Sequence, residues 1–87
     1  MRLDLFLKQS RLVLRRTVAK EMCDAGAVKV NGHRSKAGHE VKPGDLLSIR
    51  QRGRITTVRV VTVPTKQTSK KDAASLYEAV RVESIET

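Results

Sequence analysis

The chain has little of what exported and membrane proteins depend on. Cys23 is its only cysteine, so no internal disulfide can form, and nothing else in the sequence suggests an oxidising compartment. The longest apolar runs are three residues, as in Leu12-Val13-Leu14, whereas a membrane-spanning helix needs about 20. Asp4 and Lys8 interrupt the apolar residues near the start, where a signal peptide has an unbroken core. We therefore expect a cytoplasmic protein with no membrane association.

Aromatic residues are almost absent. Phe6 and Tyr77 are the only two, and there is no tryptophan. Proteins that bind single-stranded nucleic acid usually stack bases on aromatic side chains, at about 1–3 kcal/mol per base. If this chain binds a nucleic acid, we expect it to recognise the phosphate backbone and the shape of structured RNA.

The small size and missing motifs argue against an enzyme. Eighty-seven residues allow one small domain, in which a catalytic cleft with its supporting shell has little room. No phosphate-binding glycine loop, dinucleotide fingerprint or H-E-x-x-H motif occurs. His33 and His39 do not have a zinc spacing, and with Cys23 they would supply only three ligands. We expect no metal, no cofactor and no catalytic activity.

The charge is strongly one-sided. The chain carries 18 Lys and Arg against 9 Asp and Glu, a net charge of +9. All of this excess lies in residues 1–59, because residues 60–87 hold four residues of each sign. A positive field of this kind attracts polyanions or anionic lipid headgroups. The alternative is a basic surface that serves only solubility.

Hydrophobic periodicity predicts an α+β fold. Leu3, Phe6 and Leu7 share one face of a helix that ends near Ser10, and a second helix begins near Arg15. In that helix Val18, Met22 and Ala25 share a face with Ala19 beside them, Cys23 is a buried structural thiol, and Gly26 ends the helix. The remaining expected elements are strands at 27–30, 46–49 and 55–63, a hairpin turn at Asn31-Gly32, a linker at 64–71 and a C-terminal helix at 72–87.

Basic residues crowd the junction between the two predicted helices. They are Lys8, Arg11, Arg15, Arg16 and Lys20. Cations at a helix start oppose the helix dipole, at about 0.3–1 kcal/mol each. An external phosphate would relieve this, since guanidinium groups and free helix-start amides both bind it. Arg34 and Lys36, after the hairpin turn, would extend the same surface.

A second basic group surrounds the next turn. It contains Arg50, Arg52, Arg54 and Arg59. Charges there could bind an anion, or could protect an edge strand from pairing with other chains. The sequence leaves both interpretations open.

Several motifs together resemble one known domain. They are Arg2-Leu3-Asp4-x-Phe6-Leu7, Arg15-Arg16-x-x-Ala19, Ala25-Gly26-x-Val28-x-Val30-Asn31-Gly32 and Val41-Lys42-Pro43-Gly44-Asp45. This pattern is similar to the S-four-type RNA-binding domain, over residues 1–63. The resemblance implies two helices packed on a small bent sheet. Because the chain is little more than this domain, it resembles the RqcP family of short bacterial proteins, relatives of a ribosome-associated heat-shock protein.

The resemblance implies a role in ribosome-associated quality control. RqcP-like proteins bind the large ribosomal subunit that holds an obstructed peptidyl-tRNA, contact ribosomal RNA and tRNA, and support alanine tailing by an RqcH-type factor. By the same resemblance Arg2, Asp4 and Arg16 belong to the RNA-facing surface. We expect a monomer. Two alternatives are recycling of dissociated large subunits after heat shock and a basic module that binds acidic proteins.

Overall fold

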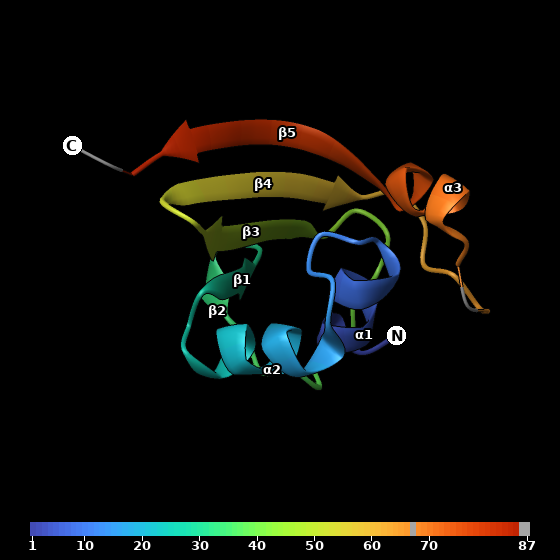
Figure 1. The fold of residues 1–87 in the computed structure, drawn as a ribbon, viewed down its shortest axis with the longest axis horizontal. Coiled ribbons are helices and arrows are strands. Elements are labelled where there is room, and N and C mark those ends of the chain that lie inside the picture. The colour runs from blue at the N-terminus through green and yellow to red at the C-terminus, as the bar shows by residue number, and fades with distance from the viewer. Residues whose placement is uncertain (67, 86–87) are drawn as a thin grey trace.

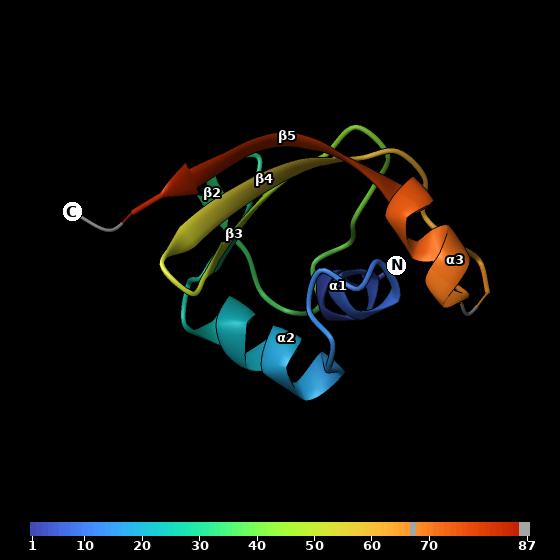
Figure 2. The same ribbon diagram turned by 45° about the horizontal axis from the view of Figure 1, so that its top comes forward.

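Two short helices lie against one face of a curved antiparallel sheet (Figures 1 and 2). The computed structural model describes residues 1–66 and 68–85. The five strands follow the order β2-β1-β3-β4-β5. The elements are α1 (Leu3–Gln9), α2 (Arg16–Asp24), β1 (Val28–Val30), β2 (His33–Arg34), β3 (Leu46–Gln51), β4 (Arg54–Val60), α3 (Lys70–Ala73), a 3₁₀ turn (Ala74–Leu76) and β5 (Tyr77–Ser84).

The core lies between α1, α2 and the inner face of the sheet. Leu3, Phe6 and Leu7 of α1 are fully buried, as their spacing predicts. Alternate residues of the strands face them, since side chains along a strand point to opposite faces in turn. These strand residues are Val28, Val30, Leu47, Ile49, Val58 and Val60. The expected α+β architecture with a bent sheet is confirmed.

Helix α2 ends where the sequence predicts. Gly26 has φ 78°, a left-handed conformation that glycine adopts without strain. Its N–H donates to the carbonyl of Cys23 at 3.0 Å, and the N–H of Ala27 donates to that of Met22 at 2.8 Å. These two bonds form a Schellman motif, which satisfies the last carbonyls of the helix.

The buried face of α2 differs from the predicted one. Val18 is 38% exposed and Ala25 is exposed, whereas Ala19 and Cys23 are buried. Ala19 and Cys23 also lie four residues apart, on a neighbouring stripe of the same helix. The small side chains on that stripe allow close packing. The buried thiol is confirmed, and burial, with Asp4 and Asp24 nearby, raises the pKa of Cys23 to about 11.

The predicted helix at 72–87 is wrong over most of its length. The side chain of Ser69 caps the start of α3 by accepting from the N–H of Asp72, but helical structure ends at Leu76. The strand β5 then pairs with β4 from Val60↔Tyr77 to Arg54↔Ser84. Without β5 the seven-residue β4 would leave its backbone groups unpaired at a sheet edge. Residues 86–87 of the predicted helix lie outside the described residues.

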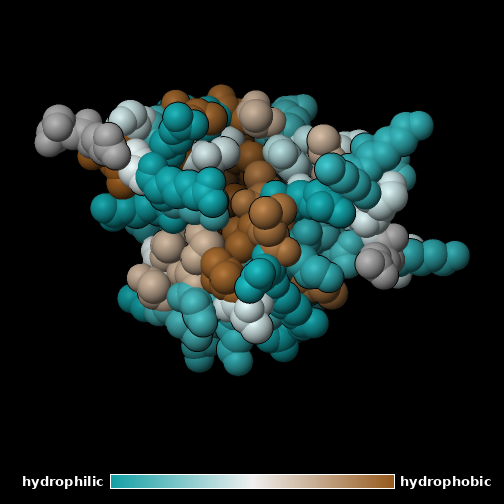
Figure 3. Space-filling model, viewed as in Figure 1, coloured by the Kyte–Doolittle hydropathy of each residue, from teal (hydrophilic) through white to brown (hydrophobic). Residues whose placement is uncertain are grey.

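Among the described residues, the exposed large apolar side chains are Leu14, Val18, Val61, Val80 and Val82. On the face drawn in Figure 3, apolar surface gathers near the middle and hydrophilic side chains project around it. Leu14, between α1 and α2, is 72% exposed. Within the described residues, no helix is long and apolar enough to cross a membrane.

Candidate nucleic-acid interface

A buried carboxylate organises the junction of α1 and α2. Asp4, in the first turn of α1, is 2% exposed. Its Oδ1 accepts from Arg2 Nε at 3.1 Å, and its Oδ2 accepts from Arg16 Nε at 3.3 Å. The N–H of Leu5 donates to Oδ1 at 2.8 Å. One carboxylate therefore connects the start of α1 to the start of α2.

The two arginines remain available to a ligand. The side chains of Arg2 and Arg16 are 51% and 47% exposed, while that of Asp4 is 3% exposed. Arg16 donates to Asp4 through Nε alone, whereas Arg2 donates through Nε and, at 3.4 Å, through NH2 to Oδ2. The other N–H groups of both guanidinium groups make no hydrogen bond to Asp4 and can bind outside the protein. We call Arg2, Asp4, Arg15 and Arg16 the arginine corner.

Asp4 is ionised in this setting. Burial raises the pKa of its carboxyl, but hydrogen bonds from Arg2, Arg16 and the N–H of Leu5, with the charge of Arg16, lower it more. The net pKa of Asp4 therefore lies below its usual value of about 3.8. The ionised carboxylate of Asp4 is therefore turned inward, where it holds the two exposed arginines.

The start of α2 has the unfavourable charge pattern that the sequence predicts. Arg15 is the N-cap, it makes no side-chain cap bond, and the first turn contains no acidic residue. Arg15, Arg16 and Lys20 are all exposed. The start of α1 is different, because the N–H groups of Leu3 and Asp4 donate to the carbonyls of His39 and Ala37. A phosphate at this corner would meet α2, whose first turn is uncapped.

Lys8 and Arg11 line a separate hollow at the other end of α1. This hollow, of about 90 Å³, is lined by Lys8, Gln9, Arg11, Leu14 and Thr68. Arg11 has φ 61°, which is unfavourable for a residue with a Cβ. The N–H of Thr68 donates to Gln9 Oε1 at 2.7 Å. Thr68 Oγ1 is buried and has no hydrogen-bond partner among the described residues.

The sequence interpretation did not single out Gln9 or Thr68. Thr68 lies in a polar segment far along the chain, and only the fold brings it to α1. Its unpartnered hydroxyl is a polar group in a basic hollow, which a bound phosphate or water would satisfy.

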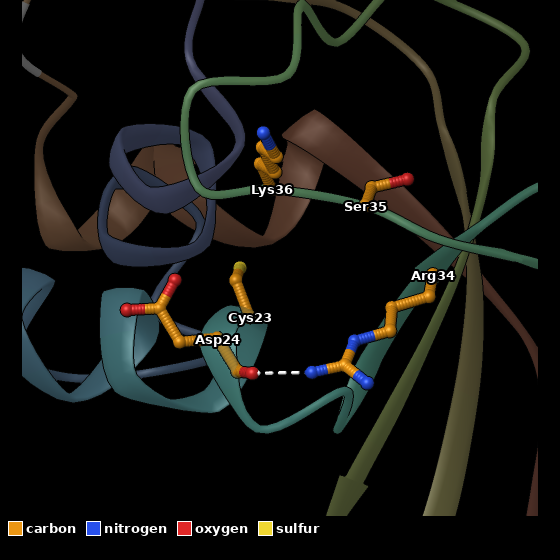
Figure 4. Close-up of a pocket in the computed structure, with 5 residues that line it drawn as sticks. All are labelled: Cys23, Asp24, Arg34, Ser35 and Lys36. Atoms are coloured by element: carbon orange, nitrogen blue, oxygen red, sulfur yellow. Dashed lines mark hydrogen bonds between the residues drawn. The ribbon is translucent and has the colours of Figure 1, made fainter.

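Arg34 and Lys36 lie near the opposite end of α2. Arg34 extends from β2 to the helix end, where its NH2 donates to the Asp24 carbonyl at 2.5 Å (Figure 4). A cation at a helix C-terminus is favourable, so Arg34 has a structural role there. Arg34 and Asp24 line a second hollow together with Cys23, Ser35 and Lys36, and the side chain of Lys36 is exposed. The nine predicted residues therefore do not form one cluster. Arg2, Asp4, Arg15 and Arg16 lie at the arginine corner, Lys8 and Arg11 line one hollow, Arg34 and Lys36 line another, and Lys20 is exposed in the middle of α2.

Comparisons with known proteins identify the family of the chain. The S4 domain family matches residues 1–47, more than half of the chain. The RQC P-site tRNA stabilizing factor of Bacillus subtilis is 46% identical over 98% of both chains. That of Halalkalibacterium halodurans is 51% identical, over 98% of this chain and 96% of the relative. The chain belongs to the RqcP family of S4-domain proteins.

Solved structures place the RqcP fold beside that of a heat-shock protein. Heat shock protein 15 of Vibrio cholerae, whose structure is described as trimeric, has a TM-score of 0.85 at 28% identity, covering 92% of this chain and 81% of that one. The solution structure of a hypothetical protein, HP1423, has a TM-score of 0.79 at 35% identity, covering 93% of this chain and 98% of that one. The predicted family and fold are confirmed. The predicted boundary at residue 63 stays a prediction.

Proposed function

We propose that this protein is a non-catalytic RNA-binding factor of ribosome-associated quality control. It binds large ribosomal subunits that hold an obstructed peptidyl-tRNA, contacts ribosomal RNA and tRNA, and supports alanine tailing by an RqcH-type factor in the cytoplasm. The names of its full-length relatives, which describe stabilisation of P-site tRNA, support this proposal. Its action is binding, without a chemical step, and we propose that it acts as a monomer.

The observation that carries the proposal is the arginine corner. Asp4 fixes two guanidinium groups in place before any RNA is present, and leaves about half of each side chain exposed. Pre-organised groups lose less side-chain freedom on binding. Arginine also matches phosphate geometry better than lysine does, because its planar fork donates two parallel hydrogen bonds.

Co-sedimentation with large subunits across a salt series tests the proposal. If about five phosphates are contacted, the logarithm of affinity falls with log salt at a slope of about −3.5 to −4.5. The double variant Arg2→Gln/Arg16→Gln removes two contacts, so we expect weaker binding and a slope shallower by about 1.4–1.8.

The matched control is Arg59→Gln/Arg81→Gln, which also removes two positive charges. Arg59 and Arg81 lie on β4 and β5, where each is paired with a glutamate.

Glutamine is preferred to glutamate as the replacement for Arg16, because a carboxylate at position 16 would face Asp4. A wild-type protein whose binding does not respond to salt would refute the proposal.

Recycling of dissociated large subunits is the second candidate. Heat shock protein 15 of Escherichia coli is 36% identical over 98% of this chain and 63% of the relative. This similarity to a heat-shock protein favours the second candidate. Deleting the gene distinguishes the two: loss of alanine tails on stalled chains supports the first function, and intact tails support the second. Partners that survive ribonuclease treatment before a pull-down would instead support binding of acidic proteins.

A further inference from the structure

The hairpin between β3 and β4 carries three arginines far from the arginine corner. Its tip lies at the opposite end of the molecule from the N-terminus (Figure 1). Arg50 pairs with Ile55 and Gln51 pairs with Arg54, so Arg52 stands in the turn. Alternation along the strands puts Arg50 on the outer face of the sheet and Arg54 on the face that the helices pack against. The three cations therefore point to both faces and the tip.

Two hollows flank this hairpin. One, of about 400 Å³, lies on the outer face and includes Lys29, Ser48 and Arg50. The other, of about 360 Å³, is lined by Gln51, Arg52, Arg54 and Thr56. Both hollows combine cations with neutral hydrogen-bonding side chains, which is the chemistry that binds phosphate.

Internal pairing does not account for these arginines. In the part of the chain that the structure describes, ion pairs involve Arg2, Arg16, Arg59 and Arg81, but not Arg50, Arg52 or Arg54. Glu83, which pairs with Ile55 near the tip of the hairpin, accepts from Arg81 at 3.4 Å.

Edge protection does not account for them either. The edges of the sheet are β2 and β5, and both β3 and β4 have neighbours on either side. The pairing of β3 continues one residue past β1, because the N–H of Arg50 donates to the carbonyl of Ala27 at 2.8 Å. Of the two interpretations that the sequence leaves open, edge protection therefore does not explain Arg50, Arg52 and Arg54.

The conformation of Arg52 is the most informative feature. Arg52 has φ 54° and precedes Gly53 with φ 74°. The other tight hairpin has nearly the same geometry, with φ 52° and 82°, but uses the favoured pair Asn31-Gly32. An arginine with positive φ is disfavoured, and here no described contact compensates. Asparagine would suit the turn better, so folding alone does not explain Arg52.

We propose that the β3–β4 hairpin is a second RNA contact, and that it enters a groove of duplex RNA flanked by two phosphate strands. Cations on both faces and at the tip fit phosphates on both sides of such a groove. The proposal rests on the proposed RNA-binding function. It means that one small protein holds two separate phosphate segments, one at each end of the molecule.

The variant Arg50→Gln/Arg52→Asn/Arg54→Gln tests this proposal by binding to purified large ribosomal subunits and to a 24-base-pair RNA duplex across a salt series. We expect affinity to fall about tenfold or more, and the salt slope to become shallower by about 2.1–2.7. The matched control is Lys66→Gln/Lys70→Gln/Lys71→Gln, which removes three exposed charges elsewhere. It should weaken binding clearly less than the hairpin variant does, because it lowers only the general electrostatic attraction.

Arg52→Asn alone checks the fold. We expect it to weaken binding while its thermal midpoint stays equal to the wild type or rises by roughly 2–6 °C. If the triple hairpin variant binds subunits and duplex with the same salt slope as the wild type, this inference is overturned. That result is expected if the hairpin contacts a protein instead of RNA. If the wild type also binds both probes without salt dependence, the proposed function itself fails.

Discussion

The arginine corner and the β3–β4 hairpin present similar charge in different ways. At the corner, Arg2 and Arg16 are held by a buried carboxylate. At the hairpin, Arg50, Arg52 and Arg54 have no acidic partner among the described residues. Fixed groups suit a defined geometry, whereas free groups adapt to whichever phosphates approach. Given the proposed RNA binding, we expect the corner to determine the orientation of the bound protein and the hairpin to add affinity.

The two tight turns make the same contrast at the level of the backbone. Asn31 stabilises the fold, because its Oδ1 accepts from the N–H of Leu46 at 2.9 Å and its Nδ2 donates to Asp45 at 3.2 Å. Arg52, with almost the same φ, makes no such bond in the described structure. Two positions with one geometry thus carry a structural residue and an exposed cation.

Replacing Asp4 by Asn should have the largest effect, because it makes the corner resemble the hairpin. The variant loses one negative charge, so the net charge rises by one and general electrostatic attraction alone predicts tighter RNA binding. We expect binding to large subunits to weaken about tenfold instead, since Arg2 and Arg16 lose the carboxylate that positions them. The free energy of unfolding should fall by about 1–3 kcal/mol, which urea titration measures.

The control for this variant is Asp24→Asn. It adds the same charge at an exposed residue that uses only its backbone carbonyl toward Arg34. We expect this control to bind as tightly as the wild type or slightly more tightly. If Asp4→Asn also binds more tightly, net charge alone governs affinity and the comparison between the corner and the hairpin fails.

Exchanging the residue types of the two turns should have a smaller effect. Asn31→Arg puts arginine at φ 52° and removes two side-chain hydrogen bonds, so we expect a loss of about 1–2 kcal/mol in the free energy of unfolding. Asn31→Gly keeps the turn conformation and removes only the bonds, so it should lose less. Equal losses for the two variants would show that φ contributes nothing, and would weaken the argument from Arg52.

Local patterns predicted the elements whose signals are local. The spacing of Leu3, Phe6 and Leu7 predicted α1, and Gly26 and Asn31-Gly32 predicted a helix end and a turn that the structure contains. The segment from Tyr77 onward misled the prediction, because its apolar residues fit a helical face as well as strand alternation. Only the presence of β4 beside it selects the strand, and that is a tertiary effect.

The site shows the same limit. Sequence identified Arg2, Asp4 and Arg16 as one group only through a family resemblance. Composition alone could not show that the carboxylate is buried between the two arginines. Nor could spacing predict that Thr68 would reach Gln9 across 59 positions, or that Arg34 would be used at the end of α2. Contacts distant in sequence are set by packing, which no local pattern encodes.

Lowering the pH should have the smallest effect of these changes. It should gradually remove the contribution of the Asp4 carboxylate to the free energy of unfolding. The pKa of Asp4 is lowered in the folded protein, so its ionisation stabilises the fold above the unfolded value of about 3.8, and this contribution is lost as pH falls through the lower folded value. Asp4→Asn lacks the ionisable group. The difference in free energy of unfolding between wild type and variant should therefore shrink below about pH 3.8 and stay constant above it. A difference that does not change down to the most acidic pH at which the fold persists would mean that the charge of Asp4 does not hold the two arginines, and that packing alone brings α1 and α2 together.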